Sequence, residues 1–122
     1  MRGYFGIGVE GVSKAMNVGA LMRSAHAFGA NFVFTVAETY RTADLNRADT
    51  SEAAANMPYY RFTDVTDFRL PEGCQLVGVE LTDEAIELPS FHHPRAAAYV
   101  LGSERVGLTP DMIDLCDHVV KI

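Results

Sequence analysis

Residues 17–25, with the sequence NVGALMRSA, are the segment from which the fold of this 122-residue chain can be worked out. Apolar residues recur there and just beyond at the spacing of one helix face: Val18, Leu21, Met22, Ala25 and Phe28. Asn17 stands where an N-cap is wanted, because its side chain can accept from the first free N–H groups of a helix. Gly29 is placed to end the helix. The pattern predicts a helix from Asn17 to Phe28.

A buried strand is predicted on each side of this helix. Residues 4–10 precede it and residues 31–37 follow it, and both segments are largely apolar. Strand, helix and strand within about 34 residues make a βαβ unit, which requires a parallel strand pair and a right-handed crossover.

The same reading extends through the rest of the chain. Further strands are predicted at 59–62, 75–80, 96–101 and 118–122. Thr109 and Pro110 predict the N-cap and first turn of a helix through Leu115. Residues 43–56 are expected to form a loop with a short helix, and residues 81–94 a loop. The fold class is therefore α/β, with a mostly parallel sheet and helices on both faces, in one domain over residues 1–122.

Composition restricts the class of protein. The apolar fraction of 48% and charged fraction of 21% are typical of a globular domain, and the apolar runs are too short to span a bilayer. No apolar signal core follows Met1. Cys74 and Cys116 are not spaced as a metal or redox pair, so we interpret them as buried thiols of a reduced, cytoplasmic protein.

The net charge of −6 counts against a nucleic-acid partner, because phosphate contacts usually need a basic surface. An acidic net charge is nevertheless compatible with a local basic patch. The residues that could form one are Arg2, Lys14, Arg23, Arg41, Arg47, Arg61, Arg69, Arg95 and Arg105.

A second segment, residues 102–108 with the sequence GSERVGL, follows a predicted strand. A glycine at the carboxyl end of a parallel strand lets a ligand approach the backbone closely. The alternative is a tight strand-to-helix turn with one glycine at positive φ. The segment is not a phosphate-binding P-loop, and its glycines are not spaced as in the dinucleotide fingerprint.

Several polar residues allow two interpretations. Arg23 is either a solvated arginine or a guanidinium aimed at phosphate, and Asn17 either a cap or a group that orients its neighbours. We expect no chemistry from His92 and His93 in their loop. We likewise interpret His26 and His118 as structural, and Glu84 and Glu87 as solvated. No metal-ligand spacing is present.

Together, the two segments resemble the first two motifs of the SpoU/TrmH family of the SPOUT superfamily. Asn17, Gly19, Arg23 and Ala25 match the form Asn-x-Gly-x-x-x-Arg-x-Ala in register. The second motif is matched by Gly102, Glu104, Gly107 and Leu108. The resemblance implies a trefoil-knotted α/β fold, S-adenosylmethionine bound in the knot, and a homodimer whose site is built from both subunits.

The resemblance also assigns the site residues by position. Arg23 matches the catalytic arginine, with Asn17 and Glu104 as its supporting polar groups. The cofactor would be held by backbone from the loop at Leu81, the turn at Gly102 and the strand end at Ile122.

The family's third motif, which should follow Ile122, has no counterpart here. We therefore expect the C-terminal part of the domain to be missing and the knot to be incomplete.

The function implied is methyl transfer from S-adenosylmethionine to a ribose 2′-hydroxyl of RNA, with no metal and no membrane. The chain starts close to its first strand, without room for a separate RNA-binding domain, which favours tRNA over rRNA. One alternative is a non-catalytic RNA-binding or dimerisation module of the same fold. Another is an unrelated nucleotide-binding α/β domain.

Overall fold

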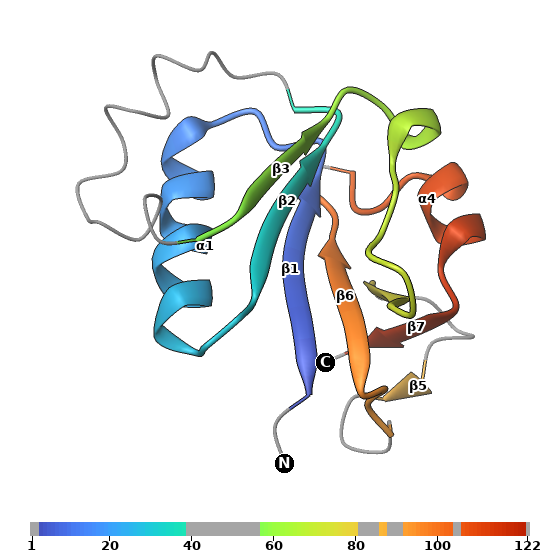
Figure 1. Ribbon diagram of the computed structural model, residues 1–122. Helices are drawn as coiled ribbons and strands as arrows, with labels where there is room; N and C mark the ends of the chain where they lie inside the picture. The colour runs from blue at the N-terminus through green and yellow to red at the C-terminus, as the bar shows by residue number, and fades with distance from the viewer. Residues whose placement is uncertain (1–2, 39–56, 81–85, 88–91, 104–105, 122) are drawn as a thin grey trace.

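The computed structural model describes residues 3–38, 57–80, 86–87, 92–103 and 106–121. Among these residues, seven strands form one sheet in the order β3-β2-β1-β6-β4-β7-β5, and every neighbouring pair is parallel (Figure 1). The strands are β1 (Tyr4–Glu10), β2 (Phe32–Val36), β3 (Tyr59–Phe62), β4 (Gln75–Val79), β5 (Ile86–Glu87), β6 (Ala96–Leu101) and β7 (His118–Lys121). The helices are α1 (Ala15–Ala27) and α4 (Pro110–Leu115), with a 3-10 turn η1 (Val65–Asp67). The α/β fold with a parallel sheet is thus confirmed.

The observed ends of α1 contradict one prediction from the sequence and confirm another. It begins at Ala15 with Lys14 as N-cap, so the prediction that Asn17 caps it was wrong. Asn17 lies inside the first turn, where its N–H donates to the Lys14 carbonyl over 3.0 Å. Gly29 ends the helix as predicted, with φ of 80°, and its N–H donates to the His26 carbonyl.

The other elements follow the predicted ranges closely. Each predicted strand is present within a residue or two of its predicted bounds, and Thr109 caps α4 as expected. The short strand β5 was not predicted, because residues 81–94 were expected to be a loop. Residues 43–56 and most of the predicted 81–94 loop lie outside the described residues, so the predictions for them stay predictions. The expected incomplete knot likewise stays a prediction. None of the described helices is long and apolar enough to cross a membrane.

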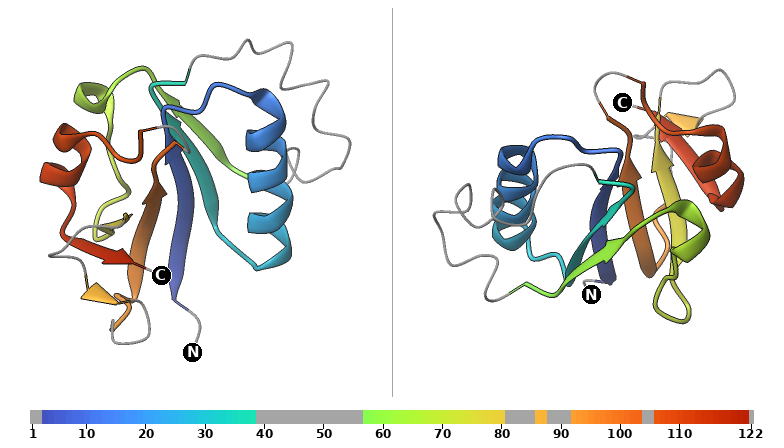
Figure 2. Two further views of the ribbon diagram at one scale, coloured as in Figure 1. Left: turned by 180° about the vertical axis from the view of Figure 1, so that it is seen from behind. Right: turned by 90° about the horizontal axis from the view of Figure 1, so that it is seen from above.

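The two helices cover opposite faces of the sheet, as Figure 2 shows. On one face, buried Val18 and Met22 of α1 pack with Val33 of β2. On the other face, buried Met112 of α4 packs in one cluster with Phe34 of β2. Neighbouring positions on a strand point to opposite faces, so the apolar run of β2, buried throughout, supplies both cores.

Two glycines on β1 let large rings lie across the sheet. Gly6 and Gly8 are in register with Phe32 and Phe34 of the adjacent strand β2. A Cβ on either glycine would overlap the ring of its partner. In β1 the two glycines therefore face the α4 side of the sheet, and the apolar side chains that alternate with them face the α1 side.

We predict that Gly8→Ala lowers the free energy of unfolding by about 1–3 kcal/mol, because the added methyl group must displace the fully buried Phe34 ring. Chemical denaturation measures the change. The control is Ser24→Ala on the exposed side of α1, which should alter stability by less than about 0.5 kcal/mol. Equal stability of Gly8→Ala and the wild type would contradict this account of the packing.

Candidate functional site

The carboxyl ends of the strands lie at one edge of the sheet, where ligands of open parallel sheets bind. Three segments of interest begin there: the loop from β1 into α1, the end of β4, and the turn of residues 102–108 after β6 (Figure 1). The first and third of these touch, because a Cβ on Gly11 would lie 3.8 Å from Cβ of Ser103. Ser103 of the second motif therefore lies beside the loop that leads into the helix carrying the first motif.

The turn after β6 folds tightly back on itself. Gly102 has no room for a side chain, since a Cβ there would overlap the backbone of Gly107 and Leu108. The Ser103 carbonyl accepts from the Gly107 N–H over 2.9 Å, and Ser103 Oγ accepts from the Val106 N–H over 3.2 Å. Gly107 has a φ of 70°, as expected of one glycine in a tight turn. The tight turn considered from the sequence is therefore present, and the close approach of a ligand to this backbone stays a prediction.

Two carboxylates anchor the end of this turn. Glu80, directly after β4, accepts from the Leu108 N–H over 2.6 Å through Oε2. Glu10, the last residue of β1, accepts from the Thr109 N–H over 2.8 Å and from the Thr109 hydroxyl over 2.6 Å. Thr109 Oγ1 in turn accepts from the Met112 N–H and caps α4. Glu10 is only 2% exposed, so these donors compensate the cost of burying its charge.

Three of the predicted site residues lie in the described part of the chain. Asn17 and Arg23 are exposed on α1, and Gly102 begins the turn after β6. Glu104, Leu81 and Ile122 lie outside the described residues.

A second polar cluster lies at the ends of β2 and β3. Glu38 accepts from the hydroxyls of Thr35 and Tyr59 and forms an ion pair with Arg61. The Glu38 side chain is 9% exposed and that of Arg61 39%, so a half-buried carboxylate holds a more solvated guanidinium. Sequence reasoning missed this cluster, as it missed Glu10 and Glu80.

Two of the histidines lie within hydrogen-bond distance of a neighbouring side chain, and both cysteines are free thiols. His93 Nδ1 lies 2.6 Å from the Tyr99 hydroxyl, and His118 Nε2 lies 2.8 Å from Gln75 Oε1. Both thiols are free but only partly buried, which corrects the expectation of buried ones. Burial, with Asp117 nearby, raises the pKa of Cys116 to about 11, so its thiolate is disfavoured. Within the described ranges, no group of three or more potential metal ligands gathers.

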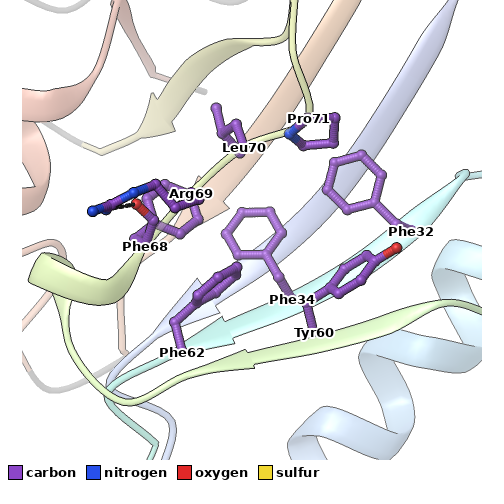
Figure 3. Close-up of a pocket in the computed structure, with 8 residues that line it drawn as sticks. All are labelled: Phe32, Phe34, Tyr60, Phe62, Phe68, Arg69, Leu70 and Pro71. Atoms are coloured by element: carbon purple, nitrogen blue, oxygen red, sulfur yellow. Dashed lines mark hydrogen bonds between the residues drawn. The ribbon is translucent and has the colours of Figure 1, made fainter.

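An aromatic cleft of about 240 Å³ lies on the α4 face, between β3 and the connection to β4. Figure 3 shows its lining: Phe32, Phe34, Tyr60, Phe62, Phe68, Arg69, Leu70 and Pro71. Nη1 of Arg69 donates to the carbonyls of Thr66 and Phe68, so it holds the connection itself. Among the described residues predicted for the site, Asn17, Arg23 and Gly102 do not line the cleft. We therefore place the candidate site at the strand ends.

Comparison of the sequence with known proteins gives a family match. Residues 5–122 match the family described as SpoU rRNA Methylase. The chain is 30% identical over 120 residues to the 23S rRNA (guanosine-2'-O-)-methyltransferase RlmB of Neisseria meningitidis serogroup B. It is 25% identical over 116 residues to the tRNA (guanosine(18)-2'-O)-methyltransferase of Escherichia coli K12. These alignments cover 93% of this chain but 47% and 51% of the relatives, so the chain spans about half their length.

Comparison of structures gives the same fold. An AdoMet-bound rRNA methyltransferase from Sinorhizobium meliloti superposes with a TM-score of 0.85 at 20% sequence identity. The match covers 100% of this chain and 48% of that one. The arrangement of strands and helices is therefore that of a known methyltransferase fold.

We predict that Thr109→Val destabilises the protein by about 1–3 kcal/mol, because it removes the cap of α4 and one of the donors to buried Glu10. Thr109→Ser keeps the hydroxyl and should stay within about 1 kcal/mol of the wild type. Urea denaturation of both variants measures the difference. A valine variant as stable as the serine variant would show that the hydroxyl contributes nothing.

Proposed function

The chain belongs to the SpoU rRNA Methylase family, and we propose that it transfers a methyl group from S-adenosylmethionine to a ribose 2′-hydroxyl of tRNA or rRNA. The observation that carries the proposal is that the loop at Gly11, which leads into the helix of the first motif, lies close to Ser103 of the second motif at the carboxyl edge of the sheet. That edge is where a ligand of an open parallel sheet is expected.

The turn at Gly102 suits a cofactor that is held by backbone. At Gly102 the backbone packs directly against the backbone of Gly107 and Leu108, with no room for a side chain between them. We propose that this turn, with Leu81 and Ile122 from the adjacent strand ends, holds the cofactor. When bound, S-adenosylmethionine supplies an electrophilic methyl group on a sulfonium centre.

We propose that Arg23 acts on the RNA, with Asn17 and Glu104 supporting it. Arg23 is exposed on α1. A guanidinium has a pKa above about 12 and is a poor base, but its planar fork binds phosphate through two parallel hydrogen bonds. Arg23 therefore clamps an RNA phosphate and orients the 2′-hydroxyl for in-line attack. The hydroxyl oxygen would form the new bond to the methyl carbon while the carbon–sulfur bond breaks and S-adenosylhomocysteine leaves, and a phosphate oxygen or a water would accept the hydroxyl proton.

A local set of cations supports the RNA partner despite the acidic net charge. Lys14 and Arg23 are exposed on the segment after β1, and Arg61 is partly exposed near the end of β3. Each can contact a phosphate near the strand ends. Homodimerisation and a cytoplasmic location belong to the same proposal. One relative named above acts on tRNA and the other on rRNA, and both act on guanosine. We retain tRNA as the first substrate to test.

We predict that Arg23→Ala lowers the initial rate of methyl transfer at least about 100-fold, because the phosphate loses its positioning group. The intact gene product is incubated with S-adenosylmethionine labelled in its methyl group and with unmodified tRNA or rRNA. Nuclease digestion then identifies a 2′-O-methylated nucleoside.

Two further variants separate the loss of the planar fork from the loss of an exposed arginine in general. Arg23→Lys keeps the charge without the planar fork and should still lose about tenfold or more. Arg95→Ala, an exposed arginine before β6, is the control and should keep its rate within about twofold. Full activity of Arg23→Lys would refute the two-bond phosphate clamp. A wild type that binds RNA but methylates neither substrate would favour the non-catalytic module.

A further inference from the structure

Four consecutive backbone N–H groups in the turn after β6 are already occupied by the protein. Those of Val106 and Gly107 donate to Ser103. Those of Leu108 and Thr109 donate to the carboxylates of Glu80 and Glu10. Glycine-rich loops that bind phosphate do so by pointing such N–H groups at the anion. At these four positions the turn offers a ligand no N–H donor, so its chemistry does not suit an anion.

Glu80 joins the turn to two strand ends. Its own N–H donates to the carbonyl of Val120 in β7 over 2.9 Å, while its side chain holds Leu108. The carboxylate also lies against Gly107, where a Cβ would overlap Oε2. Glu80 therefore fixes the relative positions of β4, β7 and the turn, the segments from which the cofactor contacts are proposed.

Glu10 adds a second negative charge behind the same turn. It is 2% exposed, so its charge is screened less by solvent than a surface charge would be. Burial and Asp117 raise the pKa of the neighbouring Cys116 thiol, and the Glu10 carboxylate raises it further. A cation placed outside the turn would interact favourably with both carboxylates.

We propose that Glu10 and Glu80 are positioning residues that hold this turn and favour the cationic sulfonium of S-adenosylmethionine over the neutral thioether of S-adenosylhomocysteine. The inference rests on the proposed function. Under this proposal the two carboxylates do more than stabilise the fold. Methyl transfer removes the positive charge of the ligand, which weakens its attraction to the carboxylates and assists product release.

The test measures binding of both ligands by isothermal titration calorimetry to the intact gene product and to Glu10→Gln and Glu80→Gln. Glutamine keeps an oxygen acceptor for the backbone N–H and removes the charge. We expect each substitution to raise the Kd of S-adenosylmethionine about three- to tenfold, the effect of one charge acting through partly solvated protein. The Kd of S-adenosylhomocysteine should change less than about twofold. Glu72→Gln, an exposed glutamate before β4, is the matched control.

Glu80→Ala removes the carboxylate that holds the turn and should raise the Kd of both ligands. Thermal unfolding shows whether this variant folds. The glutamine variants decide the question if the alanine variant does not fold. Equal weakening of both ligands by Glu80→Gln and Glu10→Gln, or no weakening of either, would overturn the charge preference. A wild type that binds neither ligand would refute the proposed function, and the inference with it.

Discussion

The hydrogen bonds between Glu10 and Thr109 join residues 99 positions apart and set the geometry of the candidate site. A carboxylate that is 2% exposed at the end of a strand is costly unless strong donors compensate it. Here the donors are the N–H and hydroxyl of the residue that begins α4. The end of β1, the turn after β6 and the start of α4 are thereby held in one arrangement.

Most of the fold could be predicted from local patterns. Apolar runs mark β1, β2, β4 and β6, and the helix between β1 and β2 indicates that these two strands run parallel. The start of α1 was misjudged because asparagine is a preferred cap, whereas the chain after β1 already turns into the helix at Lys14. Such boundaries depend on how the preceding loop packs, which single-residue preferences do not encode.

The candidate site could be predicted only in part. The motif segments were found because their glycines and polar residues stand at fixed spacings along the chain. Glu10 and Glu80 were missed because a glutamate after an apolar strand looks like an ordinary surface residue. Their partners lie 99 and 28 residues away, and only the folded sheet brings them together. A charged residue at the last position of a buried parallel strand is the signal that could have identified Glu10.

The most direct test of this account is to map S-adenosylmethionine onto the protein by NMR, from the chemical-shift changes of assigned backbone amides during a titration. The account predicts the largest changes in the turn of residues 102–108 and at Glu80, with little change at Tyr60 and Phe68 in the aromatic cleft of Figure 3. Changes concentrated in that cleft, with the turn unaffected, would contradict the placement of the cofactor at the strand ends.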